Sequence, residues 1–89
     1  MFEDALIAWD DDDDPRGNIQ HIEHNGVSMD EFEAILIDEN SKRGRSRSTG
    51  RHTAWGTLPD GREITIVYEV ESSNRQLIIR PVTAYEVED

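Results

Sequence analysis

Five basic residues stand close together in this acidic chain, with no acid among them: Lys42, Arg43, Arg45, Arg47 and Arg51. Such a cluster can hold nucleic-acid phosphates or a single phosphate group, or it can form a solvated connection. Because serine and glycine separate the bases and no apolar residue anchors the stretch, we predict a flexible basic loop at 41–50. Its first four bases would act together as a contact loop or only balance the acidic chain, whereas Arg51 enters the strand that follows.

Two other groups of side chains raise the question of metal binding. His21 and His24 are spaced i,i+3 on a predicted helix, which suits two ligands of one metal, but spacing places no third ligand. The alternative is that one histidine packs at the helix end while the other faces solvent. The aspartates at 10–14 offer carboxylate oxygens to a hard cation, yet the glycine and final glutamate of a calcium loop are absent. We therefore predict a solvated acidic loop at 10–14, with neither metal nor cofactor.

The composition sets the class of protein. With 89 residues and 35% hydrophobic content, the chain predicts a single domain, 1–89, with one modest core. It has no cysteine, so disulfides and thiolate metal sites are excluded. No apolar run approaches the roughly 20 residues that cross a bilayer, so no membrane partner is expected. The acidic N-terminus lacks the basic start of a signal peptide, and we expect a cytoplasmic location.

Charge is spread unevenly along the chain. Residues 1–41 carry 13 acids and one base, residues 42–62 carry six bases and one acid, and the remainder carries six acids and two bases. The net charge of −11 repels polyanions at long range, which disfavours RNA as a partner of the whole surface. A local positive face is still compatible with this distribution.

Two helices are predicted before the basic segment. The first would span 15–25, with Asp14 as its N-cap and Pro15 at its first position. The second begins with a capping box, because Ser28 is followed three residues later by Glu31. Its apolar staple and buried face would comprise Val27, Phe32, Ile35 and Leu36.

The pattern then changes from helical to alternating. Strands are predicted at 52–58, 62–71 and 75–82, in addition to a short apolar strand at 5–9. In the strand at 62–71, the residues that would face the core are Ile64, Ile66, Tyr68 and Val70. Trp9 and Trp55 would either stack on nucleic-acid bases or, as we expect, pack in the core. The predicted fold is α+β in the order β-α-α-β-β-β, with two N-terminal helices packed on one face of a small antiparallel sheet.

A series of short motifs resembles the BrnT-like toxins of type II toxin–antitoxin systems, whose fold is RelE-like. The motifs are WD at 9–10, NIQHI at 18–22, HNGVSMDEFE at 24–33, STGR at 48–51, GTLPDGR at 56–62, IVYE at 66–69 and TAY at 83–85. The resemblance implies a metal-independent endoribonuclease that cleaves mRNA and is neutralised by a ribbon-helix-helix antitoxin.

The resemblance also implies site residues. Cleavage of RNA needs a proton acceptor for the 2′-hydroxyl, cations for the phosphate and an acid for the leaving oxygen. Arg51, Arg62 and Arg80 are the candidate cations, and they would equally serve in ion pairs with the acids of the sheet. Among the histidines, which exchange protons near neutral pH, His24 is the candidate, and Tyr68 would assist.

The chain also departs from the family pattern. It has fewer bases, and it closes on three acids within its last four residues where the family carries a basic helix. We therefore expect an acidic, C-terminally shortened relative. The alternative function is that of a non-catalytic relative, a small acidic domain that binds a protein.

Overall fold

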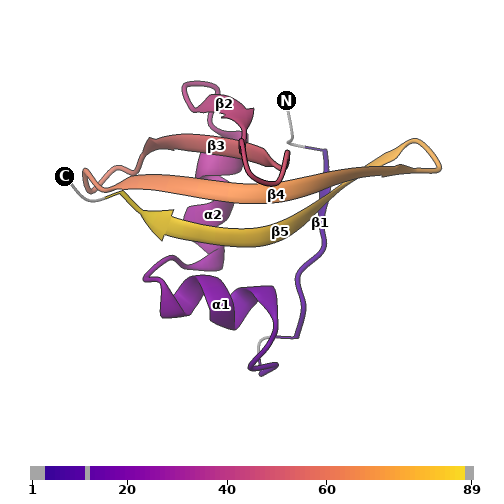
Figure 1. The fold of residues 1–89 in the computed structure, drawn as a ribbon, viewed down its shortest axis with the longest axis horizontal. Helices are drawn as coiled ribbons and strands as arrows, with labels where there is room; N and C mark the ends of the chain where they lie inside the picture. The colour runs from indigo at the N-terminus through magenta and orange to yellow at the C-terminus, as the bar shows by residue number, and fades with distance from the viewer. Residues whose placement is uncertain (1–3, 12, 88–89) are drawn as a thin grey trace.

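The computed structural model describes residues 4–11 and 13–87. The elements follow in the order β1 (Leu6–Ile7), α1 (Asn18–His24), α2 (Met29–Ile37), β2 (Lys42–Arg45), β3 (His52–Thr57), β4 (Glu63–Ser73) and β5 (Gln76–Glu86). The five strands form one sheet in the order β1-β5-β4-β3-β2 (Figure 1). The chain is therefore an α+β fold with two helices and a five-stranded sheet among the described residues.

The sheet is mixed, whereas the sequence predicted an antiparallel one. Strands β2 to β5 are antiparallel to their neighbours, but β1 runs parallel to β5, with Leu6 opposite Ile78 and Ile7 opposite Ile79. A two-residue strand that is not joined to its partner by a turn carries no local signal of its direction. The path of the whole chain decides that direction.

The first half of the predicted basic loop is a strand. Residues 42–45 form β2, paired antiparallel with β3 at the edge of the sheet. The loop prediction was wrong there because an edge strand needs few apolar residues, and charged side chains on an edge discourage pairing with other chains. Residues 46–51 connect β2 to β3; in this turn the Gly50 amide donates to the Ser46 carbonyl at 2.8 Å.

Helix α1 begins later than predicted, at Asn18, and Asp14 is not its cap. Asp14 instead closes a turn by accepting from the Arg16 amide at 2.9 Å. The Asn18 amide donates to the Asp10 carboxylate at 3.0 Å, and the Asp10 amide donates back to the Asn18 side chain at 2.9 Å. The described part of the acidic loop thus fastens the start of α1; Asp12 lies outside the described residues.

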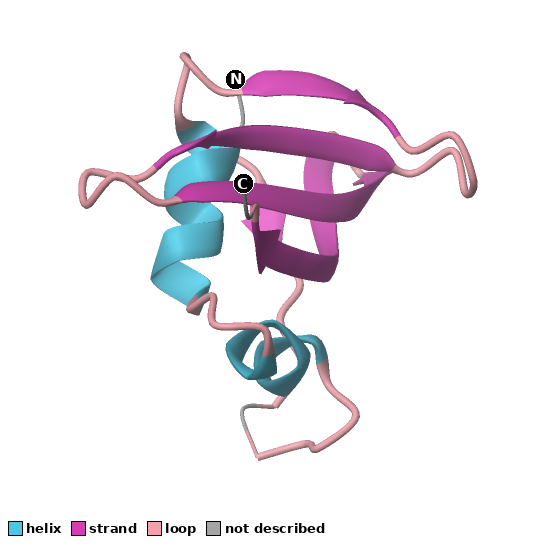
Figure 2. Ribbon diagram, turned by 60° about the vertical axis from the view of Figure 1, so that its left-hand side comes forward, coloured by secondary structure: helices cyan, strands magenta, loops and turns pink. Residues whose placement is uncertain are grey.

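Helix α2 confirms the predicted capping box. The Glu31 amide donates to the Ser28 hydroxyl at 3.1 Å, and the Ser28 amide donates to the Glu31 carboxylate at 2.9 Å. The predicted apolar face is also confirmed, because Val27, Phe32, Ile35 and Leu36 are buried. Helix α2 packs on β3 and β4, and α1 packs on β5 and α2 (Figure 2).

The core lies between the helices and one face of the sheet. On β4, Ile64, Ile66 and Tyr68 are buried and alternate with exposed or half-buried residues, as predicted. Partly buried side chains at the margin include Val70 and Trp9. The Trp9 indole lies edge-on to Phe32, with ring centroids 5.3 Å apart, which confirms its expected place against the core.

Candidate functional site

The face of the sheet opposite α2, called the open face below, carries rows of side chains in register across the strands. One row runs from Lys42 through Trp55 and Thr65 to Tyr85, and the next contains Gly44, Thr53, Val67 and Thr83. Neither helix covers this face at Trp55 and Tyr85, which are 41% and 45% exposed. Two large aromatic side chains are therefore partly exposed to solvent. The strands that carry them are separated by β4 and so lie about 10 Å apart.

Two of the three predicted cations share the open face. Arg80 lies opposite Glu69 in the β4–β5 register and donates to the Glu71 carboxylate at 2.9 Å. Arg51, just before β3, reaches the other side of Glu69, with 4.0 Å between guanidinium and carboxylate. Both arginines are thus close to glutamates on an exposed surface, where such pairs contribute little to stability.

The third predicted cation, Arg62, serves a different purpose. Its guanidinium pairs with the carboxylate of Glu31, donates to Asp60 at 3.0 Å and donates to the Gly26 carbonyl at 3.2 Å. Glu31 also completes the capping box of α2. Arg62 therefore links the turn before β4 to the start of α2. It does not share a site with Arg51 and Arg80.

We expect Arg62→Met to lower the free energy of unfolding by about 1 kcal/mol, since three hydrogen-bonded contacts of a half-buried guanidinium are lost while the aliphatic stem is kept. Arg80→Met is the matched control, because it breaks an exposed pair and should cost less than about 0.5 kcal/mol. Urea denaturation followed by circular dichroism measures both. Equal losses for the two variants would contradict the structural role of Arg62.

The remaining predicted catalytic residues do not join the arginines either. Tyr68 is buried on the core face, where its ring stacks on His52 with centroids 5.6 Å apart. His24 is exposed at the last residue of α1, on the helix that packs on β5. His21, one turn before it, bonds the Thr83 hydroxyl at 2.9 Å. The five predicted catalytic residues therefore form no single constellation.

The bases of the predicted contact loop also have separate environments. Arg43 donates to the Leu36 carbonyl at 2.9 Å near the end of α2, and Arg45 donates to the Gly50 carbonyl at 3.0 Å across the turn. Arg47 is exposed within that turn, and Lys42 extends onto the open face opposite Trp55. Their positions do not support one shared contact surface for the four residues.

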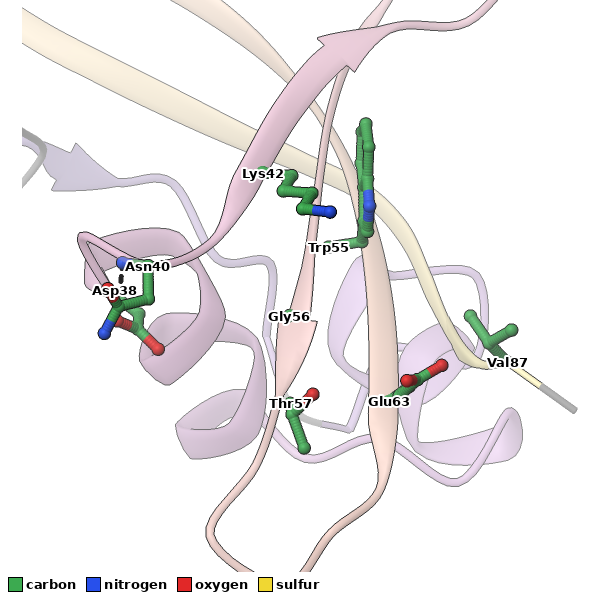
Figure 3. Close-up of a pocket in the computed structure, with 8 residues that line it drawn as sticks. All are labelled: Asp38, Asn40, Lys42, Trp55, Gly56, Thr57, Glu63 and Val87. Atoms are coloured by element: carbon green, nitrogen blue, oxygen red, sulfur yellow. Dashed lines mark hydrogen bonds between the residues drawn. The ribbon is translucent and has the colours of Figure 1, made fainter.

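A groove of about 520 Å³ lies at the end of the open face where β3 begins its turn toward β4. We call it the Trp55 groove, and Figure 3 shows its lining: Asp38, Asn40, Lys42, Trp55, Gly56, Thr57, Glu63 and Val87. Three of the five most exposed large apolar residues among those described, Trp55, Tyr85 and Val87, gather at this end of the sheet. Gathering of this kind is typical of an interaction surface.

The prediction that Trp55 packs in the core was wrong, and the neighbouring residues explain why. On the core face of β3, Ala54 is fully buried, and a Cβ placed on Gly56 would lie 2.8 Å from the Ser41 hydroxyl. The helix side of β3 thus admits only small side chains. The alternation of Ala54 and Gly56 around Trp55 was the sequence signal that places the indole on the opposite face.

The described residues contain no helix long and apolar enough to span a bilayer. Within the same part of the chain, no three histidine, aspartate or glutamate side chains are grouped as metal ligands. His21 and His24 therefore have no third partner of these types nearby among the described residues.

Comparison of this chain with protein-family models, with curated proteins and with solved structures found no match. The resemblance to BrnT-like toxins stays a prediction from the motifs in the sequence.

Proposed function

We propose that this protein is a small binding domain that holds a partner protein on the open face of its sheet. The observation that carries the proposal is the gathering of Trp55, Tyr85 and Val87, three exposed apolar side chains, at one uncovered end of the sheet. Aromatic residues are enriched at the buried centres of protein interfaces because they supply large contact areas at a small entropy cost.

Polar and charged side chains surround these three residues, as they do at the rim of a protein–protein interface. Thr53 on β3 and Thr65 on β4 are half-buried, and the ion pairs of Arg51 and Arg80 border the aromatic region along β4. An apolar centre with a solvated, charged border is the common organisation of protein–protein contacts. The dispersal of Arg62, Tyr68 and His24 weakens the case for a catalytic site.

Site-specific photo-cross-linking inside the source cells tests this function. With a photoreactive phenylalanine in place of Tyr85, we expect one discrete cross-linked protein that disappears when Trp55→Ala is added. The same probe at Asp30, exposed on α2, is the control and should give none of that species. Equal yields at the two positions, or no adduct at position 85, would contradict an interface on the open face.

A ribonuclease remains the second candidate, favoured by the placement of Arg51 and Arg80 on either side of Glu69. Two guanidinium groups on one face of the sheet could bind adjacent phosphates of RNA once their glutamate partners are displaced. The antitoxin partner that the resemblance implies belongs to this candidate. It requires a proton acceptor near these arginines; His24 is not among the residues that line the depression beside Arg51, whereas His52 and Glu69 are.

Incubation of purified protein with mRNA separates the two candidates. We expect no cleavage above that of an Arg51→Ala, Arg80→Ala double variant, and no growth defect on induced expression that the double variant relieves. Cleavage by the native chain alone would favour the ribonuclease and count against the binding domain.

A further inference from the structure

We propose that the Trp55 groove binds a lysine or arginine side chain on a basic segment of the partner protein. This inference rests on the proposed function of the open face and adds the chemistry of the residue recognised. The groove, at about 520 Å³, is large enough for a long side chain and its flanking backbone. It lies at the end of the sheet where the exposed apolar residues gather.

The lining of the groove suits the two parts of a basic side chain. The indole of Trp55 offers the aromatic surface that attracts cations most strongly, and its exposure of 41% leaves part of it open to a ligand. The carboxylates of Asp38, just after α2, and of Glu63, at the start of β4, belong to the same lining (Figure 3). Val87 and Thr57 present the apolar surface that an aliphatic stem contacts.

The charge around the groove selects a cationic partner over an anionic one. A second depression of about 360 Å³ continues from Glu63 and Val87, and it adds Asp60, Glu86 and Arg62 to the lining. Across the two depressions, four acids face two bases. Together with the net charge of −11, this arrangement attracts a basic segment during encounter and repels nucleic acid.

The chain already places a cation beside this indole. Lys42 lies directly opposite Trp55 in the β2–β3 register, and Figure 3 shows its side chain extending toward the ring. Gly44 allows the six-membered ring to lie over β2, because a Cβ at that position would be 3.3 Å from the ring. Lys42 therefore competes with an incoming cation, and its removal should strengthen binding.

Fluorescence of Trp55 measures the binding directly in a Trp9→Phe background, where it is the only tryptophan. The probes are two synthetic peptides of alternating arginine and serine, one of which carries citrulline, an uncharged isostere, at each arginine. We expect the arginine peptide to change the Trp55 emission saturably, and the citrulline peptide to bind at least about tenfold more weakly.

Three variants test the groove itself. Glu63→Gln should weaken binding of the arginine peptide at least about fivefold, because a carboxylate of the lining is lost, and Lys42→Met should tighten it by about the same factor. Glu71→Gln is the matched control: it removes the same charge from the open face near Arg80, outside the groove, and should change the affinity less than about twofold.

Two results would overturn the inference. One is equal binding of the arginine and citrulline peptides; the other is an equal loss with Glu63→Gln and Glu71→Gln, which would show attraction by net charge alone. If either occurs while the cross-link at position 85 persists, the open-face function stands and only the recognition of a basic residue fails. Absence of that cross-link overturns both.

Discussion

Tyr68→Ala should destabilise the domain strongly, with a loss of about 3–5 kcal/mol in the free energy of unfolding. The ring is 1% exposed, belongs to the core cluster and stacks on His52 at an interplanar angle of 14°. A domain of this size has about 5–15 kcal/mol of stability in all, so one truncation removes a large share of it. Thermal unfolding followed by circular dichroism should show Tm falling by more than about 10 °C.

Two further tyrosine variants test the structural role of Tyr68. Tyr68→Phe keeps the ring in the core and should cost no more than about 1.5 kcal/mol. Tyr85→Ala removes the same kind of ring from the exposed surface and should change stability by less than about 1 kcal/mol. Similar Tm values for Tyr68→Ala and Tyr85→Ala would mean that Tyr68 is not a core residue.

The elements with strong local signals were predicted from the sequence. The Ser28 capping box fixed the start of α2, because both hydrogen bonds form between residues three apart. The strict alternation around Ile66 identified β4 and its core face. Weak elements were less predictable: β2 is a short, charged edge strand, and the start of α1 depends on Asp10, eight residues before Asn18.

The candidate site was harder to predict than the fold, for a physical reason. Residue type alone does not show which partner a charge has, and Arg62, Arg51 and Arg80 are alike in the sequence. In the structure Arg62 forms an ion pair with Glu31 beside the turn before β4, whereas Arg51 and Arg80 lie on the open face. Trp55 was missed because aromatic residues are commonly buried, whereas here the small side chains beside it leave no room on the helix side.

Gly56→Ala tests that explanation, and we expect it to lower the free energy of unfolding by about 1–3 kcal/mol. The new methyl group would lie 2.8 Å from the Ser41 hydroxyl and 3.5 Å from the Ile35 side chain. That hydroxyl is buried and donates to the Ile35 carbonyl at 2.8 Å, so it cannot turn away without losing its hydrogen bond. The strand and α2 must therefore separate slightly, at the expense of core packing.

A double-mutant cycle with Ser41→Ala makes this argument specific. Removal of the hydroxyl opens space for the methyl group, so Gly56→Ala should cost at least about 0.5 kcal/mol less in the Ser41→Ala background than in the native chain. Thr57→Ala, one residue along on the exposed side, should show no such coupling to Ser41. If the costs of Gly56→Ala and Ser41→Ala simply add, then close approach of α2 is not what keeps residue 56 a glycine, and the placement of Trp55 on the open face needs another cause.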